Sequence, residues 1–372
     1  MILRRTLLFA AFLAATAAFA QTPQDTFENV KRIVAFGDIH GDYQIFTQLL
    51  QTAKLTNAKN AWIGGDAHLV LTGDYVDRGP DSAKVLDLLM ELERQAQKAG
   101  GQVHPLLGNH EAMDIYGDLR YVTPEDYKGY QQSNSKELRE AQMQAALERL
   151  KQEGTPPSNE AAWRKTFEDE HPLGWVEHRL AFLPTGKYGK WLRQKNAIIK
   201  INDSIFLHGG ISAKYASMSR QEINEKVRAE LADFSKLEGG IVTDDTNGPL
   251  WYRGLAQDPE NDPGLEALVD KVLQTHGARH IVVGHSVKEA VLPRFGGKVI
   301  TIDVGLSKVY GGPPAFLVVE DSKYYAMHRD RKIDLPVNGG SLLEYLASAA
   351  ALDPPNSPLR KLLNATRPNP AR

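Results

Sequence analysis

Aspartate, histidine and asparagine recur beside glycine in five short stretches of this 372-residue chain. The candidate residues are Asp38, His40, Asp74, Asn109, His110, His208 and His285. Oxygen and imidazole ligands without thiolate are typical of sites for divalent manganese, iron or zinc. The candidates are too many for one metal, and two ions bridged by a carboxylate form a clamp for in-line displacement at phosphorus. The pattern therefore predicts a two-metal site for phosphoryl chemistry.

Each group of candidates follows a short apolar run that predicts a buried strand. These runs cover residues 32–36, 69–72, 103–107, 204–207 and 280–283. In open α/β sheets, ligands bind beyond the carboxyl ends of the strands. We therefore expect the five strand ends to bring their polar residues to one edge. The neighbouring glycines permit the tight turns that such an edge requires.

Further apolar runs at 197–201, 299–302, 315–319 and 324–327 predict additional strands. Between the early strands, apolar residues recur at helical spacing, first near Ile45 to Leu50 and then after Pro80 until Gly100. This alternation of strands and helices favours an α/β layered fold. We expect one main domain over residues 28–350.

Residues 116–193 depart from this rhythm, because they are rich in glutamine, glutamate, lysine and arginine. They predict a helical insertion, which either packs on the core as a solvated element or forms a cap that shapes substrate access. The segment 351–372 contains several prolines among polar residues, so we expect a loose tail after a short helix at 342–346.

Residues 1–20 have the pattern of a cleaved secretory signal peptide. A basic start at Arg4 and Arg5 precedes an apolar stretch, and small residues surround a cleavage point before Gln21. The apolar stretch is shorter than the roughly 20 residues that span a bilayer. We therefore expect a periplasmic or secreted protein without a stable membrane anchor after cleavage.

Composition excludes several other classes of protein and site. The formal net charge of −2 gives no basic excess, so we expect no nucleic-acid partner. The chain has no cysteine, so disulfides cannot stabilise it. Any metal must be held by histidine, aspartate, asparagine or glutamate.

The motifs together resemble a known family. They are GDIHG at 37–41, GDYVDRG at 73–79, GNHE at 108–111, HGG at 208–210 and GH at 284–285. This set is similar to the phosphoprotein phosphatase branch of the calcineurin-like metallophosphoesterases, and most similar to the bacterial Shewanella-like protein phosphatases. The resemblance covers roughly residues 32–328. It implies a layered sandwich of mixed β-sheets flanked by helices.

The resemblance also implies how two divalent metal ions, manganese, iron or zinc, are held. The first metal is assigned to Asp38, His40 and a bridging Asp74, and the second to Asp74, Asn109, His208 and His285. A hydroxide between the ions attacks the phosphoryl group in such enzymes.

The same resemblance assigns the residues that act on the substrate. His110 donates a proton to the leaving oxygen, and Asp77 orients His110. Arg78 binds phosphate oxygens through its planar fork, and Arg253 in LWYRG at 250–254 matches a second phosphate-binding arginine. Asn109 is expected to contact the substrate as well as the metal.

Two departures from related patterns narrow the prediction. The region 301–312 reads TIDVGLSKVYGG, where eukaryotic serine/threonine phosphatases carry a SAPNYC loop, so their toxin sensitivity and serine/threonine preference do not transfer. Position 287 is Val where many diesterases carry a histidine, which favours the phosphatase branch over nucleases. Purple acid phosphatases are disfavoured because Asp77 stands where they carry a metal-binding tyrosine.

Three more polar residues are expected to have structural roles. Glu111 is expected to orient the turn in which it lies, and His68 and His104 are expected to pack or to hydrogen-bond near the site.

The sequence thus predicts a metal-dependent phosphomonoesterase acting on a phosphoprotein or phosphopeptide, with phosphotyrosine favoured over phosphoserine and phosphothreonine. The alternative within enzymes is hydrolysis of small phosphate esters or dinucleoside polyphosphates. A noncatalytic adaptor that keeps the fold is a rival of another class. The presence of His110, Asp77 and Arg78 argues against that rival, because a scaffold has no need of a proton donor.

Overall fold

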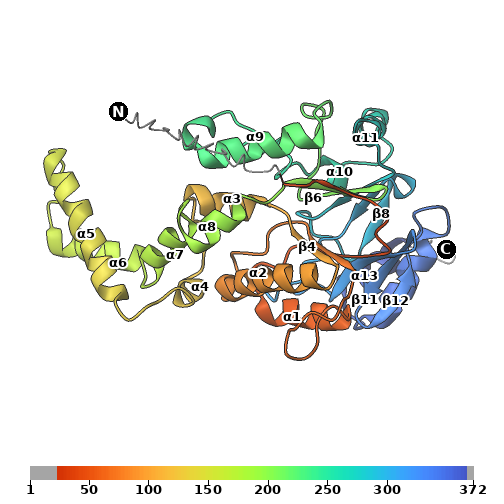
Figure 1. Ribbon diagram of the computed structural model, residues 1–372, viewed down its shortest axis with the longest axis horizontal. Coiled ribbons are helices and arrows are strands. Elements are labelled where there is room, and N and C mark those ends of the chain that lie inside the picture. The colour runs from red at the N-terminus through yellow and green to blue at the C-terminus, as the bar shows by residue number, and fades with distance from the viewer. Residues whose placement is uncertain (1–22, 367–372) are drawn as a thin grey trace, which may run out of the picture.

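The computed structural model describes residues 23–366 (Figure 1). The predicted signal peptide lies outside the described residues, so export stays a prediction. Helices lie on both sides of a central pair of β-sheets, with α1 and α2 on one side and α9 and α11 on the other (Figure 1). Within the described residues, no helix is both long and apolar enough to cross a membrane.

Twelve strands form two mixed six-stranded sheets, one ordered β1-β5-β6-β7-β9-β8 and the other β12-β11-β10-β2-β3-β4. The strands are β1 Thr26–Phe27, β2 Arg32–Phe36, β3 His68–Leu71, β4 Gln102–Pro105, β5 Ile198–Ile201, β6 Ser204–Leu207, β7 His280–Val283, β8 Leu292–Arg294, β9 Val299–Thr301, β10 Ala315–Glu320, β11 Lys323–His328 and β12 Arg331–Asp334. All nine predicted strands are present, and the short edge strands β1, β8 and β12 were not predicted. The layered sandwich of mixed sheets flanked by helices is confirmed.

The helices outside the insertion cover the sheets, connect strands or form the carboxyl-terminal segment. They are α1 Tyr43–Thr52, α2 Ser82–Lys98, α3 Asn109–Tyr116, α9 Arg220–Ala232, α10 Gly254–Gln257, α11 Pro263–His276, α12 Leu342–Leu352 and α13 Pro358–Thr366, with 3₁₀ turns η1 Phe234–Lys236 and η2 Phe295–Gly297. Helix α2 shows why such elements form: its apolar positions recur on one face, and residues such as Leu86 and Leu89 are buried there.

Parallel pairing explains why the polar strand ends converge. Strands β2, β3 and β4 are parallel neighbours, and Phe36 pairs with Leu71 and Leu71 with Pro105 at their carboxyl ends. In the other sheet β6, β7 and β9 are also parallel, with Leu207 opposite Val283. The segments that follow these strands therefore leave each sheet at a common edge.

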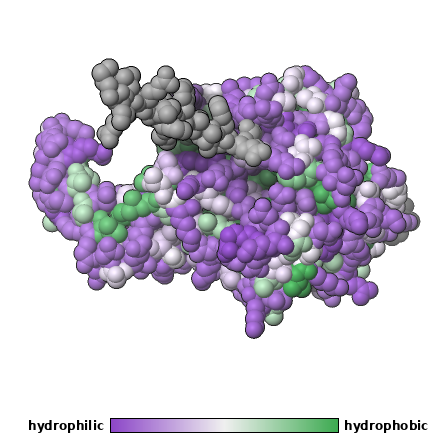
Figure 2. All heavy atoms as spheres, viewed as in Figure 1, coloured by the Kyte–Doolittle hydropathy of each residue, from purple (hydrophilic) through white to green (hydrophobic). Residues whose placement is uncertain are grey.

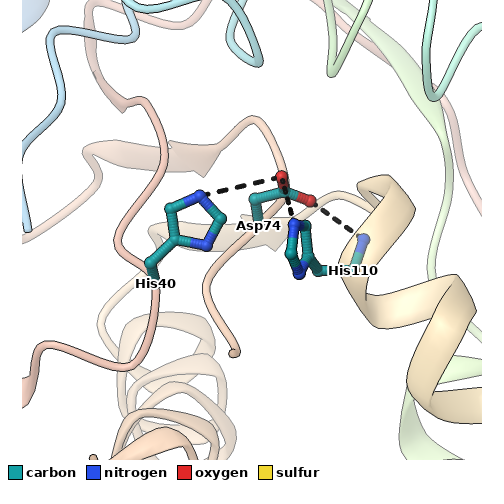
Figure 3. A group of neighbouring side chains, drawn as sticks. All are labelled: His40, Asp74 and His110. Atoms are coloured by element: carbon teal, nitrogen blue, oxygen red, sulfur yellow. Dashed lines mark hydrogen bonds and ion pairs between the residues drawn. The ribbon is translucent and has the colours of Figure 1, made fainter. Parts of the chain in front are cut away.

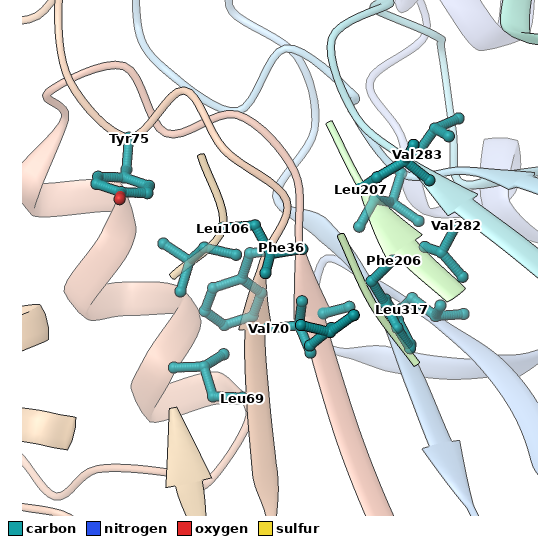
Figure 4. Packing of buried hydrophobic residues seen from close by; sticks show 14 of the residues in the cluster. Phe36, Leu69, Val70, Tyr75, Leu106, Phe206, Leu207, Val282, Val283 and Leu317 are labelled. Carbon is teal, nitrogen blue, oxygen red and sulfur yellow. The ribbon is translucent and has the colours of Figure 1, made fainter. Parts of the chain in front are cut away.

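The two sheets share one hydrophobic core. Phe36 and Val70 from one sheet and Phe206 and Val282 from the other are fully buried and belong to the same cluster (Figure 4). Removing apolar surface from water stabilises the fold by about 25 cal/mol per Å². The core thus supports the loops at the strand ends on a rigid base.

The predicted helical insertion contains five helices: α4 Pro124–Lys128, α5 Ser135–Gln152, α6 Glu160–Glu170, α7 Trp175–Phe182 and α8 Lys187–Leu192. Helices α5 and α6 project from the body as an arm (Figure 1). Helix α5 buries Met143 and Leu147, whereas α6 buries none of its residues. Hydrophilic residues cover most of the visible surface, and hydrophobic residues gather along the inner side of the arm (Figure 2).

The loose tail predicted for residues 351–372 is wrong for its described part. Helix α13 packs Leu359 and Leu363 against Ala349 and Ala350 of α12 and against Ala290. The prediction treated the prolines as evidence against regular structure. Proline is, however, well tolerated in the first turn of a helix, where its missing N–H has no intrahelical partner.

A buried ion pair fixes the turn between these two helices. Asp353 Oδ1 lies 2.9 Å from His328 Nε2 and accepts a hydrogen bond of 2.8 Å from Arg329 Nε. The carboxyl-terminal segment is thereby held against the end of β11.

We predict that Leu359→Ala lowers the free energy of unfolding by about 2–3 kcal/mol, because it removes a buried side chain that is only 1% exposed. The control is Leu362→Ala in the same helix, where the side chain is 42% exposed and the expected change is below about 1 kcal/mol. Urea denaturation of both variants measures the difference. Equal stability of the two variants would show that α13 does not pack on α12.

Candidate active site

The turns at the strand ends hold polar residues in a left-handed backbone conformation. The residues and φ angles are His40 at 47°, Asp74 at 53°, Asp77 at 67°, Arg78 at 64° and His285 at 63°. This conformation is uncommon for residues other than glycine and costs roughly 1–2 kcal/mol each. Such strain gathers at functional sites, where the surrounding structure enforces it.

The Asp74 carboxylate lies at the centre of the predicted metal site. Its Oδ2 atom is 4.0 Å from His40 Nε2, 3.8 Å from His110 Nε2 and 3.1 Å from His208 Nε2. Figure 3 shows the carboxylate between the rings of His40 and His110. Histidines from both sheets thus approach one carboxylate, which is the position that a bridging ligand requires.

The other predicted ligands surround Asp74. Asp38 lies 3.9 Å from His40 Nε2 through Oδ2 and 4.0 Å from His208 Nδ1 through Oδ1. Asn109 Oδ1 is 3.0 Å from His208 Nε2, and the centroids of the His208 and His285 rings are 4.6 Å apart. All six predicted metal-binding residues therefore meet at one place.

This donor set fits divalent cations. The possible ligand atoms of His40, Asp74 and His110 all lie within 4.8 Å of one another. The same holds for those of Asp74, His208 and His285. His285 Nε2 is buried without a hydrogen-bond partner, although buried polar atoms normally have one. Atoms at about 2.0–2.2 Å from a shared zinc ion lie up to about 4.4 Å apart, which matches the separations around Asp74.

The pKa shifts of the buried residues also favour a cation site. Burial raises the pKa of Asp38 well above its usual value, and the nearby Asp303 and Asp74 carboxylates add to the rise. Burial also lowers the pKa of His40 to about 3, which leaves its ring nitrogen free to bind a cation. Crowded buried carboxylates are stabilised when a cation shares the site.

His110 and Asp77 form a hydrogen-bonded pair beside this cluster. His110 Nδ1 donates to Asp77 Oδ2 at 2.7 Å. Burial opposes a charged imidazole, but the Asp74 and Asp77 carboxylates outweigh it and raise the pKa of His110 to about 9. Burial and the neighbouring Asp114 raise the pKa of Asp77 to about 7. The proton of the pair therefore resides on His110, as a proton donor requires.

Two arginines reach a small cavity of about 70 Å³, which we call the active-site cavity. Predicted metal ligands such as Asp38, Asp74 and His285 line it as well. The Arg78 guanidinium lies 4.5 Å from the centroid of the Tyr121 ring, and its Nη2 is 3.4 Å from His110 Nε2. Arg253 Nη1 donates to the carbonyl oxygen of His285 and to Ser286 Oγ at 3.2 Å. Both predicted phosphate-binding residues thus line the cavity.

The predicted orienting role of Glu111 is confirmed. Its carboxylate accepts hydrogen bonds of 2.8 Å from the backbone N–H groups of Asp74, Tyr75 and Gly108. These bonds join the loop after β3 to the start of α3. Glu111 therefore holds Asp74 in its strained conformation.

His68 and His104 lie elsewhere. Their rings hydrogen-bond to each other at 3.0 Å, and His104 packs on Phe27 with ring centroids 4.5 Å apart. The expected packing and hydrogen bonding are confirmed for both, but their expected position near the site is wrong, because neither lines the active-site cavity.

Sequence reasoning missed several residues of the site. Asp303 follows β9, is almost fully buried, and accepts a hydrogen bond of 2.9 Å from the backbone of Gly305. Its position after a strand and near a glycine is the same signal that identified the other ligands. Tyr121, Trp251 and Tyr310 also line the cavity, but they lie outside regular elements and carry no comparable signal.

Residues 31–289 match the family described as calcineurin-like phosphoesterase. The chain belongs to this family. A Shewanella-like protein phosphatase 2 from Arabidopsis thaliana is 31% identical over 297 residues, which cover 77% of this chain and 74% of that protein. A cold-active protein-tyrosine phosphatase from a psychrophilic Shewanella species has a crystal structure that matches with a TM-score of 0.66 and 32% identity, over 85% of this chain and 83% of that one.

A third relative of this calcineurin-like phosphoesterase matches a smaller part of the chain. A symmetrical bis(5'-nucleosyl)-tetraphosphatase from Wigglesworthia glossinidia brevipalpis is 36% identical over 94 residues, which cover 24% of this chain and 29% of that protein. Together with the family match, these similarities establish the chain as a phosphoester hydrolase of a family that uses divalent metals.

We predict that Glu111→Gln lowers the free energy of unfolding by about 3 kcal/mol, because hydrogen bonds to a charged group contribute about 1.5–3 kcal/mol each. Glu137→Gln, at an exposed position of α5, is the matched control, with an expected change below about 0.5 kcal/mol. Urea denaturation compares the two. A similar small change in both variants would contradict the orienting role of Glu111.

Proposed function

We propose that this calcineurin-like phosphoesterase is a metal-dependent phosphomonoesterase that removes phosphate from phosphotyrosine in proteins or peptides. One observation carries the proposal: His110, which is hydrogen-bonded to Asp77, lines the cavity together with both arginines and Asp74. A site of this kind can bind a phosphate, supply a nucleophile and protonate a leaving group.

The metal assignment remains the one that the motifs predict, with Asp74 shared between the two sets of ligands. When bound, two divalent cations supply Lewis acidity and lower the pKa of a water nucleophile. We assign His110 to proton donation rather than to metal binding. Its Nδ1 is engaged by Asp77, and the positive Arg78 guanidinium lies 3.4 Å from its Nε2, which opposes a second cation there.

The chain's own residues account for the rest of the reaction. Arg78 and Arg253 orient the phosphate through charge-assisted hydrogen bonds, for which the planar guanidinium is well suited. His110 transfers its proton to the leaving oxygen of the substrate as the phosphorus–oxygen bond breaks. Asp77 keeps the imidazole in place and stabilises its charged form before the transfer.

Aromatic side chains support the preference for phosphotyrosine. Tyr121, Trp251 and Tyr310 line the active-site cavity, and the Tyr310 ring lies 5.7 Å from the Arg78 guanidinium. A substrate whose phosphate reaches the arginines therefore passes aromatic faces, against which an aryl ring packs favourably. The similarity to a protein-tyrosine phosphatase over most of the chain supports the same choice.

Hydrolysis of dinucleoside polyphosphates is the weaker alternative. The similarity to the tetraphosphatase covers only 24% of this chain, which limits it to part of the shared catalytic core. It gives no support for a nucleotide site.

Substrate competition tests the proposal directly. With manganese present, we expect the protein to hydrolyse a phosphotyrosyl peptide at least about tenfold faster, in kcat/KM, than the same peptide carrying phosphoserine, since an aryl oxygen is the better leaving group. Diadenosine tetraphosphate serves as the third substrate. Preference for the dinucleotide would replace the proposal with its alternative.

A pair of variants separates metal binding from proton donation. Asp74→Asn is expected to reduce bound metal and turnover together, because Asp74 contacts both ligand sets. His110→Asn is expected to keep the metal and lose about a hundredfold to ten-thousandfold in rate, most for poor leaving groups such as phosphoserine. Metal content by plasma mass spectrometry and turnover of two esters measure this. Equal metal loss in both variants would show that His110 is a ligand.

A further inference from the structure

A second cavity of about 450 Å³ opens beside the active site, and we call it the side groove. Its lining comes from residues 287–289, the loop from Val304 to Pro313, Arg329 after β11, and residues 353–358, which lead into α13. The groove therefore combines a loop next to the last predicted ligand, His285, with the carboxyl-terminal part of the chain.

The side groove adjoins the active-site cavity. Val287 and Tyr310 line both spaces, and their side chains are 47% and 42% exposed. These two residues thus form the rim between the cavities. A ligand whose phosphate lies between Arg78 and Arg253 has its remaining atoms close to this rim.

The lining of the side groove is suited to an apolar group. Val287, Tyr310, Pro313 and Pro354 provide apolar surface, which contrasts with the hydrophilic residues that cover much of the molecule. Binding pockets commonly combine apolar surface with polar groups that fix orientation, and here the polar groups are Lys288, Glu289, Arg329, Asp353, Asn356 and Ser357. An exposed apolar surface beside a catalytic site is commonly a binding surface.

The charges of the groove balance one another. Arg329 Nε is paired with Asp353 Oδ1 at 2.8 Å, and Lys288 is followed directly by Glu289. No net charge is left to select a charged ligand.

Specific contacts hold the outer wall of the side groove in place. The ion pair of Asp353 with Arg329 holds residues 353–358, and α13 packs Leu359 and Leu363 on α12. A groove that is formed before binding loses little conformational freedom when a ligand enters, which favours affinity.

We propose that the side groove binds the polypeptide of the substrate next to its phosphorylated residue and selects an apolar side chain there. This inference rests on the proposed function, because it requires a phosphopeptide substrate. The phosphate is fixed by the arginines, and an extended peptide advances about 3.3 Å per residue, so the selected side chain lies within the first few neighbours. A side chain of leucine size in such a groove typically changes kcat/KM by about tenfold or more.

The test compares phosphotyrosyl peptides that carry leucine, serine or glutamate at the neighbouring positions on either side. We expect kcat/KM to be about tenfold higher for leucine than for glutamate, while p-nitrophenyl phosphate, which has no peptide, reports the basal activity.

Two variants connect this preference to the side groove. Asn356→Trp fills the groove at its far end, and Pro313→Asp places a carboxylate in its apolar lining. Both are expected to reduce the preference for leucine to within about twofold and to leave p-nitrophenyl phosphate turnover unchanged. Asn261→Trp, an exposed position in the turn before α11, is the matched control and keeps the preference.

The outcomes are distinguishable. Equal hydrolysis of all three peptides by the wild-type protein, or an unchanged preference in both groove variants, would overturn the side-groove proposal and leave the phosphatase function standing. Hydrolysis of p-nitrophenyl phosphate without hydrolysis of any phosphopeptide would overturn the proposed function and the side-groove proposal together.

Discussion

The structure depends on holding the buried carboxylate of Asp74 at the junction of two sheets. Its backbone is strained, at a φ of 53°, and its N–H donates a hydrogen bond to the Glu111 carboxylate, which holds it there. The parallel strands on both sides bring histidines toward its oxygens. Such a cluster of buried charges is unfavourable by itself, and a cation bound in the site that we propose would offset the repulsion.

The pairing of the strands explains how much the sequence could predict. Strands β2 and β3 are parallel neighbours in one sheet, so the motifs after them had to lie close together once these strands were recognised. Strand β6 belongs to the other sheet, and the packing of the two sheets, which strand pairing does not determine, brings His208 to Asp74. Asp303 also follows a parallel strand, β9, so the same argument identifies it as a residue of the site. Tyr121 and Tyr310 could not be found in this way, because irregular loops place them and only tertiary packing determines such loops.

The carboxyl-terminal segment shows a second limit of prediction from the sequence. Its prolines suggested a loose chain, yet Pro358 begins a helix whose leucines pack on α12. Short apolar repeats of this kind gain stability only from a partner surface, which a local pattern does not reveal. The insertion shows a third limit: its helical content and polar composition were predicted, but it was expected to pack on the core or to cap the site, whereas α5 and α6 project from the body as an arm.

A crystal structure of the manganese-loaded protein, with anomalous scattering recorded, tests the central claim most directly. Our account predicts two anomalous peaks about 3.5–4 Å apart, with Asp74 between them, His208 and His285 at one and Asp38 and His40 at the other. His110 stays bonded to Asp77 and coordinates neither ion. A single peak, or a peak coordinated by His110, would contradict the account.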